Sequence, residues 1–257
     1  MRQISSALLI AAVGAGFAWA GLVVVYNDLP TGKRTANEFA FARLVYENRI
    51  TLPGYYKGWY TDYPLGDRNL LLSVKRVLKL DAAAEPVALR ATDPALMSYP
   101  FLYTSEPGHM LLGEGEALAL REYLDRGGFW MLDDFWGSLE WGDLECELRK
   151  VFPAGAIEEV GLDHPLFHSF YDIQDILQVP NSGQGFCQPD CPTSEQDGYR
   201  PQFWGIHDAS GKLVVLVCFN TDLMDGAELA GDARYPERYS IYALKVFINA
   251  IIYAMSH

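Results

Sequence analysis

GGFWMLDDFWGSLEW, residues 127–141, contains the pattern that decides how this chain folds. Its apolar run, 129–132, has the length and composition of a buried β-strand, and the glycine pair before it is a typical end of a preceding helix. The run stops at two adjacent aspartates, Asp133 and Asp134, which lie among aromatic residues. Two like charges beside apolar rings cost stability, so the fold must satisfy both carboxylates or use them in a site.

Helical and extended patterns alternate on both sides of this stretch. Short apolar or alternating runs predict strands, and apolar residues at helical spacing predict helices. The predicted strands are 38–46, 87–91, 99–107, 129–132, 157–161 and 212–220, and the predicted helices are 69–80, 114–126, 144–151 and 239–255. This alternation indicates βαβ units and an α/β fold with a mainly parallel sheet. We expect a single domain over residues 27–257, with a loop-rich insertion around 163–201.

The composition is that of an acidic globular protein. Half of the 257 residues are hydrophobic and 13% are aromatic, which is enough for a packed core. The formal net charge is −13, so the polyanionic backbone of a nucleic acid would be repelled and no nucleic-acid partner is expected. The sequence also lacks the phosphate-binding motifs GxxxxGK[ST] and GxGxxG and the nucleophile turns GxSxG and GxCxG.

The first residues predict export. Arg2 precedes an apolar run, 7–25, and AWA at 18–20 fits the cleavage pattern of a signal peptide. The same run is about long enough to span a bilayer, so an uncleaved anchor that tethers the protein to the membrane is the alternative. Residues 1–26 are therefore either a signal peptide or an N-terminal anchor. Both interpretations place the remaining chain outside the cytoplasm, in the periplasm or on the inner membrane.

The four cysteines agree with export. Cys187 and Cys191 lie in the Pro-bounded loop GFCQPDCP, which in an oxidising compartment predicts a small disulfide loop. A metal clip is the competing interpretation, but no second Cys or His pair has suitable spacing. Cys146 and Cys218 are expected to be buried free thiols, with a second disulfide as the alternative.

Three predicted strands end in polar clusters, at 104–106, 133–134 and 220–222. In open α/β sheets, ligands bind beyond the carboxyl ends of the strands. We therefore expect these clusters to converge on one crevice. The candidate residues of this crevice are Glu106, His109, Asp133, Asp134, Trp136, Asn220 and Asp222.

The charged candidates have both a structural and a chemical interpretation. Asp133 or Asp134 either accepts backbone hydrogen bonds in a turn or provides a carboxylate for metal, sugar or acid–base chemistry. His109 is either an exposed loop residue or a general acid–base. The segment 218–228 is either a loop of Asx turns or a set of oxygen ligands for Ca²⁺ or Mg²⁺.

Two other patterns have weaker chemical interpretations. His164 and His168 have a spacing that zinc sites use, but Pro165 disfavours a helix there. Several aromatic residues form either a stacking platform for a sugar or peptide, or part of the core that covers the sheet edge. They are Tyr55, Tyr56, Trp59, Tyr60, Tyr63, Trp136 and Trp141.

A series of segments resembles a bacterial family, the domain of unknown function numbered 4159. They are EFAFARLVY, WYTDYP, YPFLYTSEPG, LREYLDRGGFWMLDDFWGSLEW, DHPLF, FNTD and the closing helix, and they extend over roughly 37–255. The resemblance implies a class I glutamine-amidotransferase-like protein with a flavodoxin-like three-layer α/β/α sandwich, usually exported or membrane-anchored. Active amidotransferase relatives use a Cys nucleophile with a His and an acidic partner. Here Asp133 and Asp134 stand at the equivalent turn, so no catalytic residue is carried over.

Three hypotheses of function follow. The first is a non-catalytic ligand-binding or assembly module of the bacterial cell envelope, whose partner is an envelope protein or a saccharide held in the strand-end crevice. The second is a metal- or carboxylate-dependent hydrolase of envelope sugar or peptide, with Asp133 or Asp134 as base or metal ligand and His109 as acid. The third is a degenerate enzyme fold kept as a scaffold. The sequence identifies no cofactor.

Overall fold

Five parallel strands form the centre of the molecule. The computed structural model describes residues 38–49 and 57–256. The parallel strands are β1 (Ala42–Val45), β3 (Val87–Arg90), β4 (Phe101–Ser105), β6 (Phe129–Asp133) and β9 (Leu213–Phe219), arranged in the order β3-β1-β4-β6-β9. Antiparallel β8 (Gln202–His207) and β7 (Glu158–Glu159) complete a seven-stranded sheet beyond β9. The parallel part has the 2-1-3-4-5 order of the flavodoxin type.

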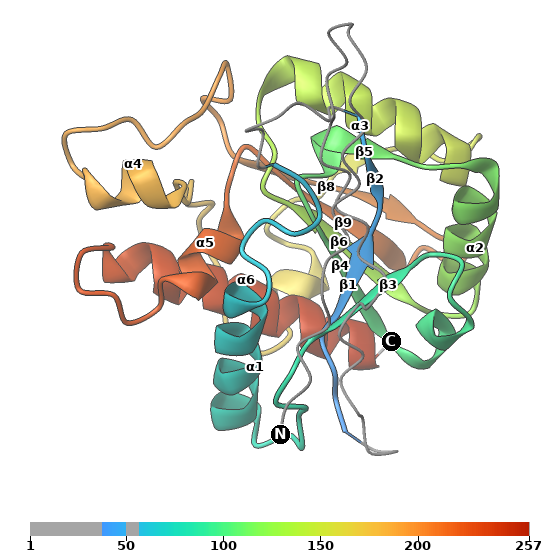
Figure 1. Ribbon diagram of the computed structural model, residues 1–257, viewed down its shortest axis with the longest axis horizontal. Helices are drawn as coiled ribbons and strands as arrows, with labels where there is room; N and C mark the ends of the chain where they lie inside the picture. The colour runs from blue at the N-terminus through green and yellow to red at the C-terminus, as the bar shows by residue number, and fades with distance from the viewer. Residues whose placement is uncertain (1–37, 50–56, 257) are drawn as a thin grey trace, which may run out of the picture.

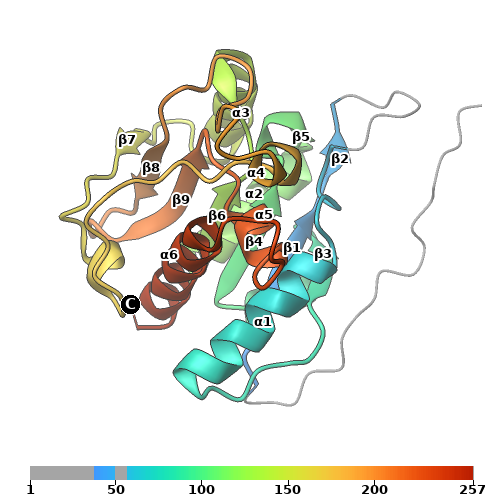
Figure 2. The same cartoon turned by 90° about the vertical axis from the view of Figure 1, so that its left-hand side faces the viewer.

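Helices cover both faces of this sheet, as Figures 1 and 2 show. One layer contains α1 (Leu65–Leu78), α5 (Leu223–Glu228) and α6 (Glu237–Ser256), and the other contains α2 (Glu114–Asp125) and α3 (Gly137–Val151). Alternate residues of β6 serve the two layers: Phe129 and Met131 join the core beneath α6, and Trp130 and Leu132 join the core beneath α2 and α3. The predicted three-layer α/β sandwich is confirmed.

The remaining elements are short. β2 (Glu47–Asn48) pairs with β5 (Met110–Leu111) in a separate two-stranded sheet, and α4 (Ser182–Phe186) lies in the long segment between β7 and β8. In the described part of the chain, α6 alone is long and apolar enough to cross a membrane, but 67% of its most apolar window is buried, as in a core helix. Residues 1–26, on which the expectation of export depends, lie outside the described residues, as do Tyr55 and Tyr56.

Several predicted boundaries were wrong. Helix α3 begins at Gly137, not at 144, and α1 begins at Leu65, not at 69. Strand β8 was not predicted, because the polar segment before it extended the expected loop as far as 201. In the predicted strand 157–161, only two residues pair with β8. The start of α3 was missed because Gly137 enters the helix with a φ of 75°, a conformation that helical periodicity does not signal.

The carboxyl ends of the three middle strands share an unusual backbone conformation. Glu106 follows β4, Asp134 follows β6 and Asn220 follows the end of β9, and their φ angles are 50°, 62° and 58°. This left-handed region is uncommon for residues other than glycine, although Asp and Asn tolerate it better than Glu. The chain therefore turns sharply off each strand at the edge where the candidate residues lie.

Candidate functional site

All seven candidate residues lie at this edge of the sheet, and all are buried. Glu106 and His109 follow β4, Asp133, Asp134 and Trp136 end or follow β6, and Asn220 and Asp222 follow β9. None of the seven is more than 5% exposed. The three strand ends thus lie side by side at one edge of the sheet, and other segments of the chain cover the side chains there.

Of the two interpretations of Asp133, a turn acceptor or a chemical carboxylate, its contacts support the first. Its carboxylate accepts hydrogen bonds from the backbone N–H groups of Leu223 (3.3 Å) and Met224 (3.0 Å) and from the Tyr103 hydroxyl (3.2 Å). It therefore holds the first turn of α5 against the end of β6. Burial, and then the adjacent Asp134, raise the pKa of Asp133 well above its ordinary value, although the backbone N–H groups oppose this.

We expect Asp133→Ala to lower the free energy of unfolding by about 2–3 kcal/mol, because it leaves buried donors without an acceptor. Asp133→Asn keeps a carbonyl oxygen for Met224 N–H and the Tyr103 hydroxyl but turns an NH2 group toward Leu223 N–H, so it is expected to cost about 1 kcal/mol, less than Asp133→Ala. Urea unfolding followed by tryptophan fluorescence measures both values. Equal losses in the two variants would show that the hydrogen bonds to α5 are not what Asp133 contributes.

Asn220 and Asp222 also have their polar atoms occupied. The Asn220 Oδ1 atom accepts from the backbone N–H of Gly137 (2.9 Å), and its Nδ2 donates to the carbonyl of Arg200 (2.8 Å). Asp222 is the N-cap of α5 and accepts from the backbone N–H of Asp225 (2.8 Å). These two residues therefore fasten the end of β9 to its neighbours.

Glu106 and His109 meet a third side chain, Glu140, in the first turn of α3. The Nε2 atom of His109 lies 3.6 Å from Glu106 Oε2 and 3.5 Å from Glu140 Oε1. One ligand atom from each of the three residues falls within 4.8 Å of the other two. Glu106, His109 and Glu140, hereafter the His–Glu–Glu centre, are all buried.

Local packing explains how β4 and α3 bring these residues together. The Tyr46 hydroxyl donates to the carbonyls of Ser105 (2.8 Å) and Glu106 (2.7 Å), which holds the turn after β4. At Gly108 the backbone passes so near α3 that an added Cβ would lie 2.5 Å from the Cβ of Glu140. Glycine is therefore required there for His109 and Glu140 to meet.

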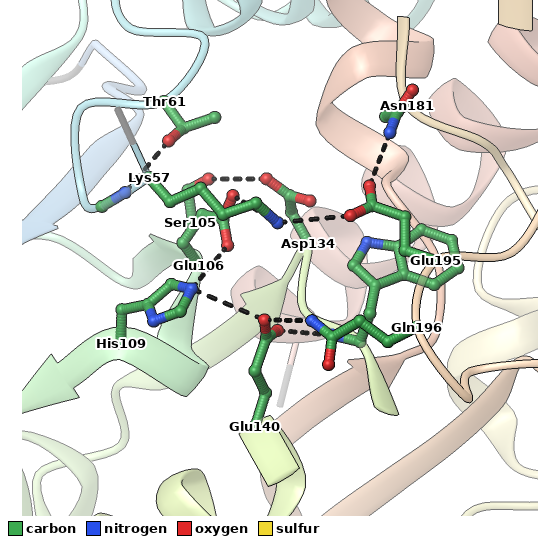
Figure 3. Close-up of polar contacts among 12 residues, drawn as sticks. Lys57, Thr61, Ser105, Glu106, His109, Asp134, Glu140, Asn181, Glu195 and Gln196 are labelled. Carbon is green, nitrogen blue, oxygen red and sulfur yellow. Dashed lines mark hydrogen bonds and ion pairs between the residues drawn. The ribbon is translucent and has the colours of Figure 1, made fainter. Parts of the chain in front are cut away.

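Glu140 is held by two donors from different parts of the chain. Its Oε2 accepts from the backbone N–H of Trp136 (2.7 Å), and its Oε1 accepts from the side-chain amide of Gln196. Gln196 belongs to residues 195–197, hereafter the strap, which crosses the site (Figure 3). On the far side of Gln196, Asp197 accepts from the backbone N–H of Ser138 (2.8 Å) and from its hydroxyl (2.7 Å).

Lys57 is the cation nearest to the centre among the described residues. Its Nζ lies 3.4 Å from Glu106 Oε1 and 3.4 Å from Glu195 Oε2, as Figure 3 shows. Burial lowers the pKa of Lys57, but the carboxylates around it, Glu106 foremost and then Asp134, outweigh that effect and raise it. Lys57 therefore stays charged, and it neutralises only part of the negative charge.

The buried carboxylates consequently hold protons more tightly than usual. Burial, and then Asp134, raise the pKa of Glu106 well above its ordinary value, and burial raises the pKa of Glu140. Burial raises the pKa of Asp134 to about 7, although Lys57 opposes this. His109 behaves oppositely: burial and then Lys57 lower its pKa to about 4, so its imidazole is neutral at pH 7. A neutral imidazole has a lone pair that can bind a metal ion.

Two unsatisfied carboxylate oxygens mark the site. Glu106 Oε2 and Asp62 Oδ2 are buried and have no hydrogen-bond partner among the described residues. Glu106 Oε2 points into the His–Glu–Glu centre, where His109 is 3.6 Å away. Asp62 belongs to two neighbouring all-carboxylate groups, one with Asp134 and Asp222 and one with Asp225 and Glu228. A buried acceptor without a donor is costly, so each oxygen is suited to a cation.

The sequence missed Glu140, Lys57 and the strap. Glu140 was overlooked because α3 was expected to start at 144, although an acidic residue shortly after a strand end is a usual sign of a first helical turn. Lys57 and the strap come from irregular segments and carry no local pattern. His164 and His168 join no group of metal ligands in the described chain: His164 accepts from Leu166 N (3.2 Å), and His168 pairs with Asp172 (2.6 Å).

Three of the four cysteines are as expected, and the fourth is free as expected but not buried. Cys187 and Cys191 form a disulfide with a Cα–Cα distance of 5.6 Å, and Cys218 is a buried free thiol. The expectation that Cys146 is buried was wrong, since it is exposed on α3. Leu144 and Leu148 turn toward the sheet, and Cys146, half-way between them on the helix, turns toward solvent.

The aromatic candidates divide between the core and a cavity. Trp59 is 6% exposed and packs on Tyr60 and Tyr63, and Trp136 is completely buried. For these residues the core interpretation holds. Trp141, in contrast, lines a cavity together with Trp204, which the sequence did not single out.

Comparison with known protein families confirms the family that the motifs resemble. The model of the family described as "Domain of unknown function (DUF4159)" matches residues 40–255, which is most of the chain and includes every residue of the candidate site. A search of the curated proteins found no match. The turns at Glu106, Asp134 and Asn220 thus all lie within the matched domain. The protein belongs to the DUF4159 family.

Proposed function

We propose that this protein is a metal-binding module of the bacterial cell envelope, and that its ligand is a divalent first-row transition-metal ion held by Glu106, His109 and Glu140. The proposal keeps the expected ligand-binding role of the strand ends and gives it a chemical identity. The predicted leader, 1–26, supports an exported or membrane-tethered location.

The spacing of the ligand atoms carries the proposal. Two ligands bound tetrahedrally to one zinc ion, at about 2.0–2.1 Å each, lie about 3.4 Å apart. The His109 Nε2 atom is 3.6 Å from Glu106 Oε2 and 3.5 Å from Glu140 Oε1. An ion can therefore be accommodated with small side-chain movements, and it would satisfy the buried Glu106 Oε2, which has no hydrogen-bond partner in the described chain.

The ligand types favour a transition metal over Ca²⁺ or Mg²⁺. Ca²⁺ and Mg²⁺ prefer oxygen ligands, whereas imidazole with carboxylates suits Zn²⁺, Mn²⁺ or Fe²⁺. Lys57 contacts Glu106 through Oε1, so the Oε2 atom remains available on the side of His109. Three protein ligands, two from the turn after β4 and one from α3, would leave at least one coordination position of the ion for water or a further molecule.

Metal binding to the full-length purified chain tests this assignment. Isothermal titration calorimetry with Zn²⁺ and Mn²⁺, with elemental analysis of the dialysed protein, is expected to show one ion per chain. His109→Gln and Glu106→Gln are each expected to weaken Zn²⁺ binding at least about 100-fold. Loss of a residue that only orients a metal ligand lowers affinity by about 10- to 100-fold, and loss of the ligand itself should lower it at least as much. Glu106→Gln keeps the shape of the side chain but removes the partner of Lys57, so urea unfolding of the metal-free variant checks that lost binding is not lost folding.

Matched controls separate the centre from other histidines and carboxylates. His168→Gln and Glu122→Gln alter exposed residues outside the site and should bind Zn²⁺ like the wild type. Zn²⁺ affinity that survives His109→Gln would place the ion elsewhere, and the all-carboxylate groups around Asp62 would then be examined with Ca²⁺. Absence of stoichiometric binding of either transition metal would refute the proposal.

A second candidate is the hydrolase, favoured by the conformation of Asp134. Asp134 has a φ of 62° at the turn from β6 toward α3, and its pKa of about 7 suits a general base. Strained turns of this kind present nucleophiles in other α/β enzymes. Together with the strand order, this turn supports placement in the class I glutamine-amidotransferase-like superfamily. Metal-dependent hydrolysis of peptidoglycan fragments that is lost in Asp134→Asn would favour the hydrolase. Folded, metal-bound protein without such activity would leave metal binding as the only supported function.

A further inference from the structure

The cavity lined by Trp141 and Trp204 lies next to the strap, because Asp197 of the strap is also one of its lining residues. Its volume is about 300 Å³. It is lined by Gly137, Ser138, Trp141, Asp197, Trp204, Phe219 and Asn220. It thus lies where β8, β9 and the first turns of α3 meet. Cavities of about this size that combine aromatic walls with a few polar groups are typical of small-molecule sites.

The apolar side of this cavity is a continuous aromatic surface. The ring of Trp141 lies 5.2 Å from that of Trp204 and 4.8 Å from that of Phe219, measured between centroids. Behind them Phe135 is buried and stacks on Trp141 with an interplanar angle of 17°. An aromatic cage for a quaternary ammonium group needs space for the cation between its rings. These rings contact one another and leave no such space. They instead offer a surface on which a ring can stack.

The polar side of the cavity consists of hydrogen-bonding groups that suit hydroxyls. Asp197 accepts two hydrogen bonds from Ser138, which lower its pKa and keep it ionised. A carboxylate has about four lone-pair positions, so Asp197 retains capacity for further donors. Ser138 is exposed, and its hydroxyl can also accept. A negative carboxylate and a net charge of −13 disfavour phosphates and other anions.

We infer that this cavity is a binding subsite for one uncharged pyranose ring of a saccharide. The apolar C–H face of the ring stacks on Trp141, Trp204 and Phe219, and its hydroxyls donate to Asp197. This inference does not depend on the metal site, because none of the residues that line the cavity is a proposed ligand.

Saturation-transfer difference NMR on the full-length chain tests the subsite, with chitotriose, cellotriose and maltotriose as probes. At least one trisaccharide is expected to bind, and its affinity follows from quenching of tryptophan fluorescence. Asp197→Ala and Trp141→Ala are each expected to weaken binding about 10-fold or more. Because loss of Trp141 can disturb packing, Ser138→Tyr provides a second variant that fills the cavity from an exposed position and should abolish binding.

Two comparisons make the result specific. Phe170→Ala removes an aromatic ring that is 50% exposed but lies outside the cavity, and it should leave the affinity unchanged. Titration in excess EDTA should give the same affinity, so failure of metal binding and failure of saccharide binding are distinguishable. No binding of any trisaccharide, or binding that Asp197→Ala and Ser138→Tyr leave intact, would overturn the inference. Binding of phenyl-β-glucoside without binding of methyl-β-glucoside would overturn it as well, in favour of an aromatic ligand.

Discussion

Arg43→Met is expected to lower the free energy of unfolding by about 3–5 kcal/mol, because it leaves Asp67 buried without its partner. Both side chains are 0% exposed. The guanidinium donates from Nε to Asp67 Oδ1 (3.0 Å) and from Nη2 to Oδ2 (2.8 Å). Its Nη1 also donates to the carbonyls of Trp59 (2.9 Å) and Thr61 (2.6 Å). Arg43 therefore joins β1, α1 and the loop that carries Asp62.

Urea unfolding measures this loss, and two further variants interpret it. Arg43→Met combined with Asp67→Leu removes both charges and should recover part of the stability, since a well-packed apolar pair can replace a buried ion pair. Arg126→Ala breaks an ion pair with Glu122 in which the two side chains are 63% and 55% exposed. Because exposed ion pairs contribute little, this variant should cost less than about 1 kcal/mol. A loss below about 1 kcal/mol in Arg43→Met would contradict the assigned role of the pair.

Metal-free protein is expected to become less stable as pH rises through neutrality. The pKa of Asp134 is raised from 3.8 to about 7 in the folded state, so the folded protein binds more protons than the unfolded chain between these values. The free energy of unfolding therefore falls as pH increases, by about 4 kcal/mol in total from this group, of which about 0.8 kcal/mol falls between pH 6.5 and 8.0. Glu106, Glu140 and Asp222, whose pKa values are also raised by burial, act in the same direction.

His109 has the opposite sign over a lower range of pH. Its pKa falls from 6.5 to about 4 on folding, so its contribution to the free energy of unfolding rises with pH between these values. This contribution is nearly constant only above about pH 7.5, one unit above the pKa of His109 in the unfolded chain. From pH 6.5 to 8.0 the rise from His109, about 0.4 kcal/mol, is smaller than the fall from Asp134, about 0.8 kcal/mol, so the net decline reports the carboxylates.

Chemical unfolding at pH 6.5, 7.2 and 8.0, in the presence of EDTA, measures this dependence. Asp134→Asn does not titrate and is expected to reduce the decline, whereas Asp197→Asn, at an exposed carboxylate, should not change it. Saturating Zn²⁺ should stabilise the protein more at pH 8.0 than at pH 6.5, because metal ligands bind in their deprotonated form. Stability that rises from pH 6.5 to 8.0 without metal would show that Asp134 is already ionised below neutrality.

Much of the fold was predictable because its elements are local. The apolar run 129–132 became β6, the helical spacing of 114–126 became α2, and the closing amphipathic segment became α6. The alternation of these elements was enough to predict a mainly parallel sheet and the edge at which its strands end. The start of α3 and all of β8 were missed, since Gly137 begins its helix in a left-handed conformation and β8 follows a long irregular segment.

The α/β class, the disulfide between Cys187 and Cys191, and the edge that gathers Glu106, His109 and Asp134 can all be derived from the amino-acid sequence alone. Hydrophobic periodicity and residue type are properties of neighbouring residues, so they can be recognised along the chain. Only the tertiary structure brought Glu140, Lys57 and the strap to that edge and enclosed the carboxylates among them. Those contacts join residues separated by about 30 to 140 positions, and they depend on strand register and helix packing, which no local pattern encodes.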